Sequence, residues 1–146
     1  MAENAVGSMT ESNDKAASAR VASCPCGQLS VACQGEPGRV SVCHCLDCQR
    51  RSGSVFAAQA RFPVERVQMT GRAAERVRVG DNGAARFHFC PDCGAIGWYT
   101  NDSMPGLIAV PIGNFADPDF PAPSFSVFEN RKHAWVQITG DGIEHD

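Results

Sequence analysis

The chain has 146 residues, of which 43% are hydrophobic and 20% are charged, and its formal net charge is -3. This length fits one globular domain with a single core and excludes a second domain. A weakly acidic chain gives no electrostatic reason to expect nucleic acid or an anionic membrane as a partner. The apolar runs fall far short of the roughly 18 residues that a membrane span needs.

The N-terminal segment, residues 1–20, is small, polar and without hydrophobic periodicity. It has no apolar stretch of the kind found in a secretory signal, so we interpret it as a disordered leader. The ordered domain is expected over residues 21–140, with a flexible tail at residues 141–146. A chain without an export signal is expected in the cytoplasm.

Short alternating segments follow the leader, separated by Gly, Pro and Asp, and this pattern predicts half-buried strands. The strands are expected at residues 28–33, 39–43, 54–62, 74–80, 85–90, 95–100, 107–112 and 124–129. Residues 81–83, Asp-Asn-Gly, predict a tight hairpin turn. Residues 46–53 form the one helix candidate, which Gly53 would end. The sequence thus predicts a mainly β fold with little helix.

Eight cysteines are unusual for a chain of this size, and seven of them lie in short clusters. Cysteines one or two residues apart rarely form disulfides with each other, because disulfide geometry restricts the Cα separation and the Cβ directions. Without an export signal, the spacing favours metal binding in a reducing compartment over a secreted disulfide framework.

Two of the clusters resemble each other: Cys-Pro-Cys-Gly at 24–27 and Cys-Pro-Asp-Cys-Gly at 90–94. In both, Pro fixes the turn, and Gly lets backbone N–H groups face the sulfur atoms. Two thiolates from each turn would complete a tetrahedral Cys₄ zinc site. We predict a structural zinc held by Cys24, Cys26, Cys90 and Cys93, which would contribute directly to folding.

The remaining cluster, Cys-His-Cys-Leu-Asp-Cys at 43–48, offers three thiols: Cys43, Cys45 and Cys48. A zinc ion with three protein ligands and an open fourth position is typical of catalytic sites. His44 or Asp47 could close the site, although the His44 side chain should diverge from its neighbours. Cys33, His88 and His133 are the other candidates. We favour an open site and interpret Cys33 as a buried free thiol.

An open zinc ion on three thiolates is soft and a weak Lewis acid, so it suits a substrate sulfur better than a hydroxide. The expected chemistry is capture of a substrate thiol while a carbon–sulfur bond forms or breaks.

Residues 50–86 contain eight arginines and only three acidic residues. Arg50 and Arg51 follow Cys48 and could bind the carboxylates of an anionic thiol through their forked N–H groups. In Glu75-Arg76-Val77-Arg78-Val79, alternation predicts arginines facing solvent and valines facing inward. Nucleic-acid binding is disfavoured because aromatic residues are not interleaved with the basic ones.

These motifs in this order, with Glu-Asn-Arg-Lys-His-Ala-Trp at 129–135, resemble the glutathione-dependent formaldehyde-activating enzyme family, which includes centromere protein V. The resemblance covers residues 21–136. It implies a β-tent fold of antiparallel sheets and two zinc ions per chain. It implies a structural zinc on Cys24, Cys26, Cys90 and Cys93 and a catalytic zinc on Cys43, Cys45 and Cys48. It also implies condensation of glutathione with formaldehyde to S-hydroxymethylglutathione, a carbon–sulfur lyase reaction in reverse.

The chain departs from the family pattern at Ser126-Val127-Phe128, where many members have a His-Ile-aromatic stretch that is expected to shape the substrate pocket. Two other functions remain open: a non-catalytic zinc domain that binds a protein or nucleic acid, and a redox or metal-storage protein that uses its Cys-x-x-Cys pairs. The sequence does not predict an oligomeric state.

Overall fold

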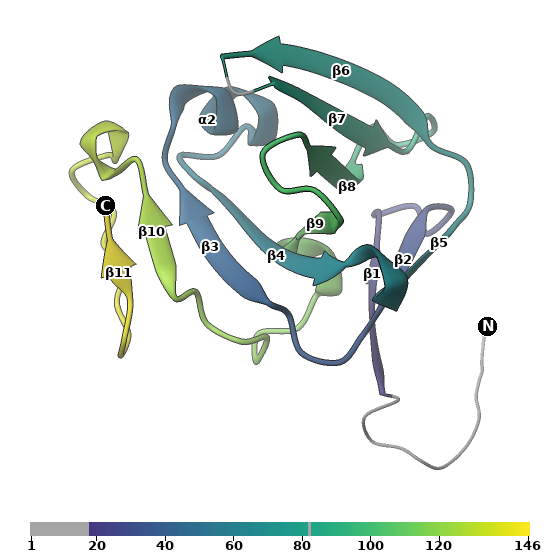
Figure 1. Cartoon of the computed structure of the whole chain (residues 1–146), viewed down its shortest axis with the longest axis horizontal. Coiled ribbons are helices and arrows are strands. Elements are labelled where there is room, and N and C mark those ends of the chain that lie inside the picture. Colours follow the sequence, from purple (N-terminus) through teal and green to yellow (C-terminus); the bar gives the residue numbers. More distant parts are fainter. Residues whose placement is uncertain (1–17, 82) are drawn as a thin grey trace.

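Two β-sheets form the framework of the chain, as the computed structural model in Figure 1 shows. It describes residues 18–81 and 83–146. Most of the predicted leader and Asn82 therefore lie outside the described residues. Within the described ranges there are eleven strands and a single α-helix, which confirms the mainly β fold class. No helix among these residues has both the length and the apolar character needed to cross a membrane.

The smaller sheet has three antiparallel strands in the order β1 (Ala19–Ser23), β2 (Ser30–Gln34) and β5 (Val67–Thr70). Strand β1 starts inside the segment predicted to be a leader, so the ordered domain begins before residue 21. Neither β1 nor β5 was predicted. Ala22 of β1 and Val67 and Met69 of β5 pack in or against the core, but each strand offers only one or two such residues, too few for a clear alternating pattern.

The larger sheet has eight strands in the order β11-β10-β3-β4-β9-β8-β7-β6. The seven longer or central members match predicted strands. Strand β10 runs parallel to both β3 and β11, so the sheet is not purely antiparallel. The bounds are β3 (Arg39–Cys43), β4 (Ala57–Pro63), β6 (Ala74–Gly80), β7 (Gly83–Phe89), β8 (Ile96–Asn101), β9 (Leu107–Pro111), β10 (Phe125–Val127) and β11 (Glu144–His145).

The C-terminal segment is held in the sheet, contrary to the flexible tail that the sequence predicted. Strand β11 pairs with β10, and the Glu129 backbone N–H donates to the Asp146 carbonyl at 2.9 Å. The His145 Nδ1 lies 2.7 Å from a Glu129 carboxylate oxygen. These backbone and polar contacts leave no apolar pattern in the sequence.

The hydrophobic core lies between the two sheets. Cys33 is fully buried there, away from the other cysteines, as its alternating strand predicted. The core side chains come from both sheets and from the 3₁₀ helix η2 (Ile112–Phe115). They include Ala22, Val31, Cys33, Val40, Ala60, Phe62, Ile108, Val110 and Phe115.

The opposite face of the larger sheet carries polar side chains together with the rings of Phe87 and Tyr99. Paired residues in a sheet point to the same face, so register places Cys43 beside Ala57, and Ser41 beside Gln59. The same face continues through Tyr99, which is opposite both Ala109 and Phe87. One face of the sheet therefore packs in the core, and the other carries Cys43, Ser41, Gln59 and Tyr99.

Helix α2 (Leu46–Ser52) follows β3 directly and confirms the helix prediction. Cys45 caps its N-terminus, and Gly53 ends it in the left-handed region at φ 73°. The remaining short helices are the 3₁₀ turns η1 (Val64–Arg66) and η3 (Glu129–Arg131).

The side-chain direction predicted for strand β6 is wrong. Val77 is 46% exposed and Val79 is 78% exposed. Arg76 instead stacks on the buried ring of Phe87, and Arg78 pairs with Asp47 of helix α2. The strand is at the edge of the sheet, and among the described residues its valine face stays exposed.

Gly71 lies very close to the backbone of Gln28, and a substitution there tests how tightly these two segments pack. It has φ +103°, and a Cβ atom there would overlap the backbone carbonyl of Gln28. We expect Gly71→Ala to lower the free energy of unfolding by about 3 kcal/mol or more, from strain plus steric overlap. Urea denaturation measures this change.

Gly106 is the matched control, because it has φ +78° and no other atoms within 4 Å of the position that a Cβ would take. Gly106→Ala should cost only the strain of a positive φ, about 1–2 kcal/mol. Equal losses in the two variants would contradict the proposed overlap.

Candidate metal centres

The three-cysteine cluster, Cys43, Cys45 and Cys48, is built where strand β3 meets helix α2. Cys43 ends the strand, Cys45 is the N-cap and Cys48 lies in the first turn. Their sulfur atoms all lie within 4.8 Å of one another. The Cys48 backbone N–H donates to the Cys45 sulfur at 3.3 Å, so the helix start itself orients one potential ligand.

His44 points away from this cluster, as predicted. It is fully buried, and its Nε2 lies 3.0 Å from the Ser126 hydroxyl. Burial lowers the pKa of His44. Its backbone N–H donates to the Val127 carbonyl at 3.0 Å, and Gln49 donates to its carbonyl at 2.8 Å. His44 therefore anchors the cysteine loop to strand β10.

Arg51 provides positive charge beside the cluster. Its Nη2 donates to the Cys48 sulfur at 3.4 Å. Hydrogen bonding from Cys43, aided by Arg51, lowers the pKa of Cys48 to about 5 against the opposing effect of burial. Cys48 is thus the thiol of this cluster that most readily exists as a thiolate.

The four-cysteine cluster, Cys24, Cys26, Cys90 and Cys93, joins two turns that are far apart in sequence. Its sulfur atoms also lie within 4.8 Å of one another. Cys26 is 3.6 Å from both Cys24 and Cys90. Tetrahedral coordination with Zn–S bonds of ~2.3 Å requires sulfur separations of about 3.8 Å, so the arrangement fits zinc.

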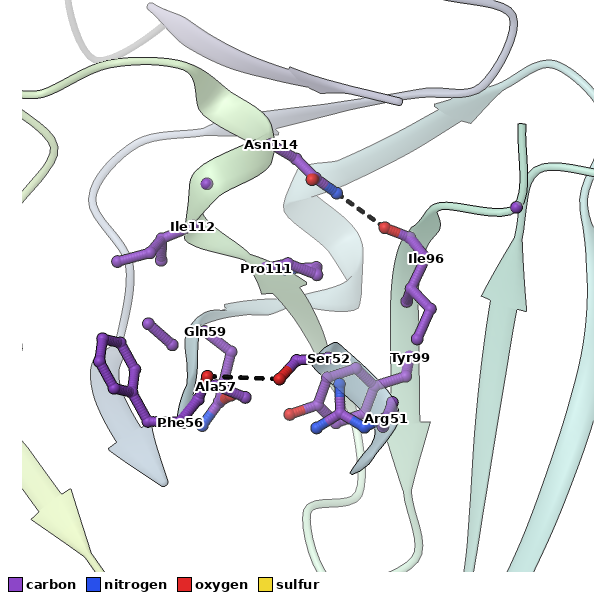
Figure 2. Close-up of a pocket in the computed structure, with 13 residues that line it drawn as sticks. Arg51, Ser52, Phe56, Ala57, Gln59, Ile96, Tyr99, Pro111, Ile112 and Asn114 are labelled. Carbon is purple, nitrogen blue, oxygen red and sulfur yellow. Dashed lines mark hydrogen bonds between the residues drawn. The ribbon is translucent and has the colours of Figure 1, made fainter. Parts of the chain in front are cut away.

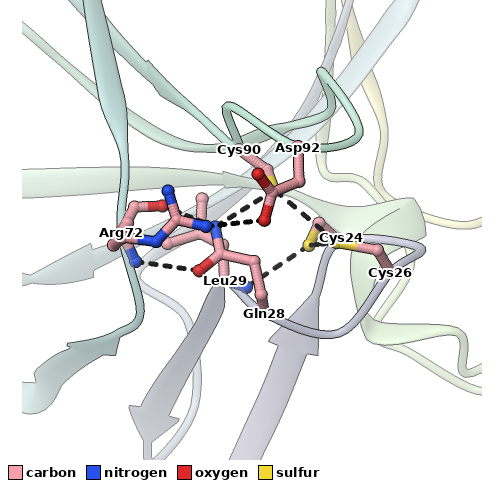
Figure 3. A network of polar contacts seen from close by, with 7 residues as sticks. All are labelled: Cys24, Cys26, Gln28, Leu29, Arg72, Cys90 and Asp92. Atoms are coloured by element: carbon pink, nitrogen blue, oxygen red, sulfur yellow. Dashed lines mark hydrogen bonds and ion pairs between the residues drawn. The ribbon is translucent and has the colours of Figure 1, made fainter.

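Gln28 reinforces this cluster, as Figure 3 shows. Its amide donates to the Cys90 sulfur at 3.1 Å and to the Arg72 carbonyl at 2.6 Å. The Arg72 side chain in turn pairs with Asp92 at 2.6 Å. Burial raises the pKa of Cys90, but hydrogen bonds from Gln28 and the turn backbone outweigh it and lower the pKa to about 6.

The donor sets are compatible with zinc at both clusters. All eight cysteines are free, and no disulfide competes for the sulfur atoms. Four thiols complete one tetrahedron, whereas three leave one position for another ligand. Two thiols of the four-cysteine cluster, Cys24 and Cys90, are buried, which suits a site that fastens the fold.

A cavity of ≈ 470 Å³ lies between elements that carry the two clusters, and Figure 2 shows its wall. Ala57, paired with Cys43, and Arg51, bonded to Cys48, border it on one side. Gly94 and Ile96, which follow Cys93, border it on another. The other lining residues include Phe56, Gln59, Tyr99, Pro111, Ile112 and Asn114.

Of the two arginines predicted to bind substrate, Arg51 lines this cavity and Arg50 does not. Arg50 instead borders a smaller cleft on the outer side of Arg51. Ser126 does not shape the cavity, contrary to expectation, because it is fully buried against His44. Tyr99 and Gln28 were missed: their positions depend on strands that only the fold brings together.

The other candidate ligands lie outside both clusters. Asp47 forms an ion pair with Arg78 at 3.1 Å. The His88 ring stacks on Trp98 with centroids 3.6 Å apart, and His133 lies 3.0 Å from the Gln49 side chain. None of these side chains joins the three thiols in the described structure.

Comparison with known proteins places these features in context. The sequence model for "Glutathione-dependent formaldehyde-activating enzyme" matches residues 19–131. A crystal structure of a Rhodobacter sphaeroides protein superposes with a TM-score of 0.52 at 20% identity, covering 64% of this chain and 85% of the other. That likeness concerns the fold. Comparison with curated protein sequences finds no match.

Metal analysis of single-cysteine variants tests the two clusters separately. We expect about two zinc ions per wild-type chain and about one in either Cys93→Ser or Cys45→Ser. Cys93→Ser should lower the melting temperature more, because the four-cysteine cluster joins distant turns. Plasma mass spectrometry and thermal unfolding give the two readouts.

Cys33→Ala is the matched control, since Cys33 is a buried thiol outside both clusters. It should keep both zinc ions. Two zinc ions retained in Cys45→Ser would show that the three-cysteine cluster is not a metal site.

Proposed function

Because the chain belongs to the glutathione-dependent formaldehyde-activating enzyme family, we propose that it is a zinc-dependent carbon–sulfur lyase that interconverts glutathione plus formaldehyde and S-hydroxymethylglutathione. The observation that carries the proposal is the three-cysteine cluster, an incomplete ligand set beside a cavity of ≈ 470 Å³. Three thiols with room for a fourth sulfur suit thiol chemistry better than water activation.

The reaction needs no oxidant or reductant. The thiol loses its proton, and the sulfur forms a bond to the carbonyl carbon of formaldehyde. The electron pair of the C=O π bond moves to oxygen, which takes up a proton to give the hydroxymethyl group. The reverse reaction breaks the carbon–sulfur bond by the same steps.

Zinc bound to the three thiolates would supply one coordination position and lower the pKa of a thiol that binds there. The protein's own contribution begins with Arg51. Its guanidinium touches the Cys48 sulfur and lines the cavity, where it balances negative charge and orients an anionic substrate.

Tyr99 is the proposed hydrogen-bond donor to the carbonyl oxygen. Its ring lies beside Phe87 and under Arg51, with centroid distances of 5.0 Å to the Phe87 ring and to the Arg51 guanidinium carbon. Burial raises the pKa of Tyr99 to about 12, so its hydroxyl keeps its proton at neutral pH. A protonated hydroxyl on the cavity wall can stabilise the negative charge that develops on oxygen.

The free state of all eight cysteines supports a reducing compartment, such as the cytoplasm, for this activity. Glutathione is abundant in such compartments as the thiol that keeps cysteines reduced.

Exchange NMR of formaldehyde with glutathione tests the proposal directly. Zinc-loaded wild-type protein should accelerate the exchange at catalytic concentrations, and Cys45→Ser should abolish the acceleration because it removes a metal ligand. Cys33→Ala should retain it. A wild-type protein that holds two zinc ions yet gives no acceleration would instead favour a non-catalytic zinc domain.

Tyr99→Phe tests the hydrogen-bond donor. Loss of the hydroxyl should lower kcat at least about tenfold, with little change in KM for glutathione, because the bond strengthens as the reaction proceeds. Zinc content serves as the control for an intact site. An unchanged kcat would show that Tyr99 is not the hydrogen-bond donor to the carbonyl oxygen.

A further inference from the structure

A second cleft, of ≈ 230 Å³, lies between helix α2 and the hairpin of β6 and β7. We call it the arginine cleft. The helix and the hairpin lie next to each other at the top of Figure 1. Four arginines and one acid line the cleft: Arg50, Arg51, Arg76, Arg78 and Asp47.

Neighbouring groups hold three of these arginines in place. The buried ring of Phe87 lies below both Arg51 and Arg76, whose guanidinium carbons are 4.8 Å and 5.0 Å from its centroid. Arg78 is fixed by its 3.1 Å ion pair with Asp47. Stacked and paired guanidinium groups have already lost much of the side-chain freedom that binding would otherwise cost.

The charge of the cleft is unbalanced. Four guanidinium groups face one carboxylate in a small volume, although the whole chain has a net charge of -3. Arg51 also donates to the Cys48 sulfur, so among the described residues that line the cleft Asp47 is the one acid available to Arg50, Arg76 and Arg78. Like charges held this close repel one another, and a bound anion would relieve that repulsion.

Ordinary surface roles explain only part of the arrangement. Arg50 and Arg51 lie in the last turn of a helix, where positive charge interacts favourably with the helix dipole. Arg76 and Arg78 come from a different element. They turn toward the helix even though this leaves Val77 and Val79 exposed to solvent. The dipole of α2 does not account for that orientation.

We propose that the arginine cleft binds a carboxylate of the anionic peptide thiol on which the three-cysteine cluster acts. This inference rests on the proposed function. Arg51 connects the two places, because it lines both the cleft and the cavity and touches the Cys48 sulfur. The paired N–H groups of a guanidinium match a carboxylate. The small volume suits one such group rather than a polyanion.

Binding of S-methylglutathione to zinc-loaded protein tests the inference by calorimetry. This probe keeps both carboxylates but has no thiol, so its binding does not depend on formaldehyde chemistry. The double variant Arg76→Gln/Arg78→Gln should bind it at least tenfold more weakly than wild type. The single variant Arg50→Gln, whose native side chain makes no polar contact within the described structure, should also weaken binding without disturbing the fold.

Arg86→Gln is the matched control, because Arg86 lies on β7 of the same hairpin but pairs with Asp102 on the other face. It should bind the probe like wild type. The diethyl ester of S-methylglutathione, which lacks both carboxylates, should bind wild type and the double variant equally weakly. Zinc content and thermal unfolding confirm that each variant is folded.

Wild-type affinity in both arginine variants would overturn the inference, and so would an ester that binds wild type as tightly as the diacid. Tighter binding of inorganic phosphate than of the diacid, lost in the double variant, would also overturn it in favour of a general oxyanion site. Arginine-dependent binding without accelerated formaldehyde exchange would reject the proposed reaction while leaving the carboxylate site in place.

Discussion

The rest of the structure depends on the convergence of four thiols from two distant turns. Cys26 and Cys90 are 64 positions apart in sequence, yet their sulfur atoms are 3.6 Å apart. One turn connects β1 to β2 in the small sheet, and the other connects β7 to β8 in the large sheet. A metal ion at this point would fasten the two sheets together and position Gly94 and Ile96 on the cavity wall. A metal ion in this cluster would therefore both join the two sheets and help to shape the cavity.

The two faces of the large sheet have different roles: one packs in the hydrophobic core, and the other carries the residues of the candidate site. The core face packs Val40, Phe62 and Val110 against the small sheet, so that face contributes the hydrophobic free energy. The other face carries Cys43, Gln59 and Tyr99, whose polar groups would be costly in that core. Because successive side chains of a strand alternate, β3 and β4 supply both faces at once.

The positive charge of Arg51 acts on both the cavity and the arginine cleft, because its side chain lines both. It contacts the Cys48 sulfur, stacks on Phe87 and Tyr99, and lies on the wall shared by the cavity and the arginine cleft. A lysine could not make all of these contacts, since they use a planar, forked guanidinium. The family membership and these contacts together support a substrate that carries both a thiol and a negative charge.

The sequence by itself determined the features that depend on neighbouring residues. Cysteine spacing predicted both clusters, Gly53 predicted the end of the helix, and alternation predicted most strands. Only the tertiary structure decided which face of each strand is buried and which faces solvent or the cavity, because burial depends on strand register and on the elements that cover the sheet. The directions of Arg76 and Arg78, the position of Tyr99 and the pairing of strands β1, β5 and β11 all depend on such long-range contacts. The spacing of Cys43, Cys45 and Cys48 could indicate an open site, but only the fold places a cavity and a cleft lined by four arginines near it.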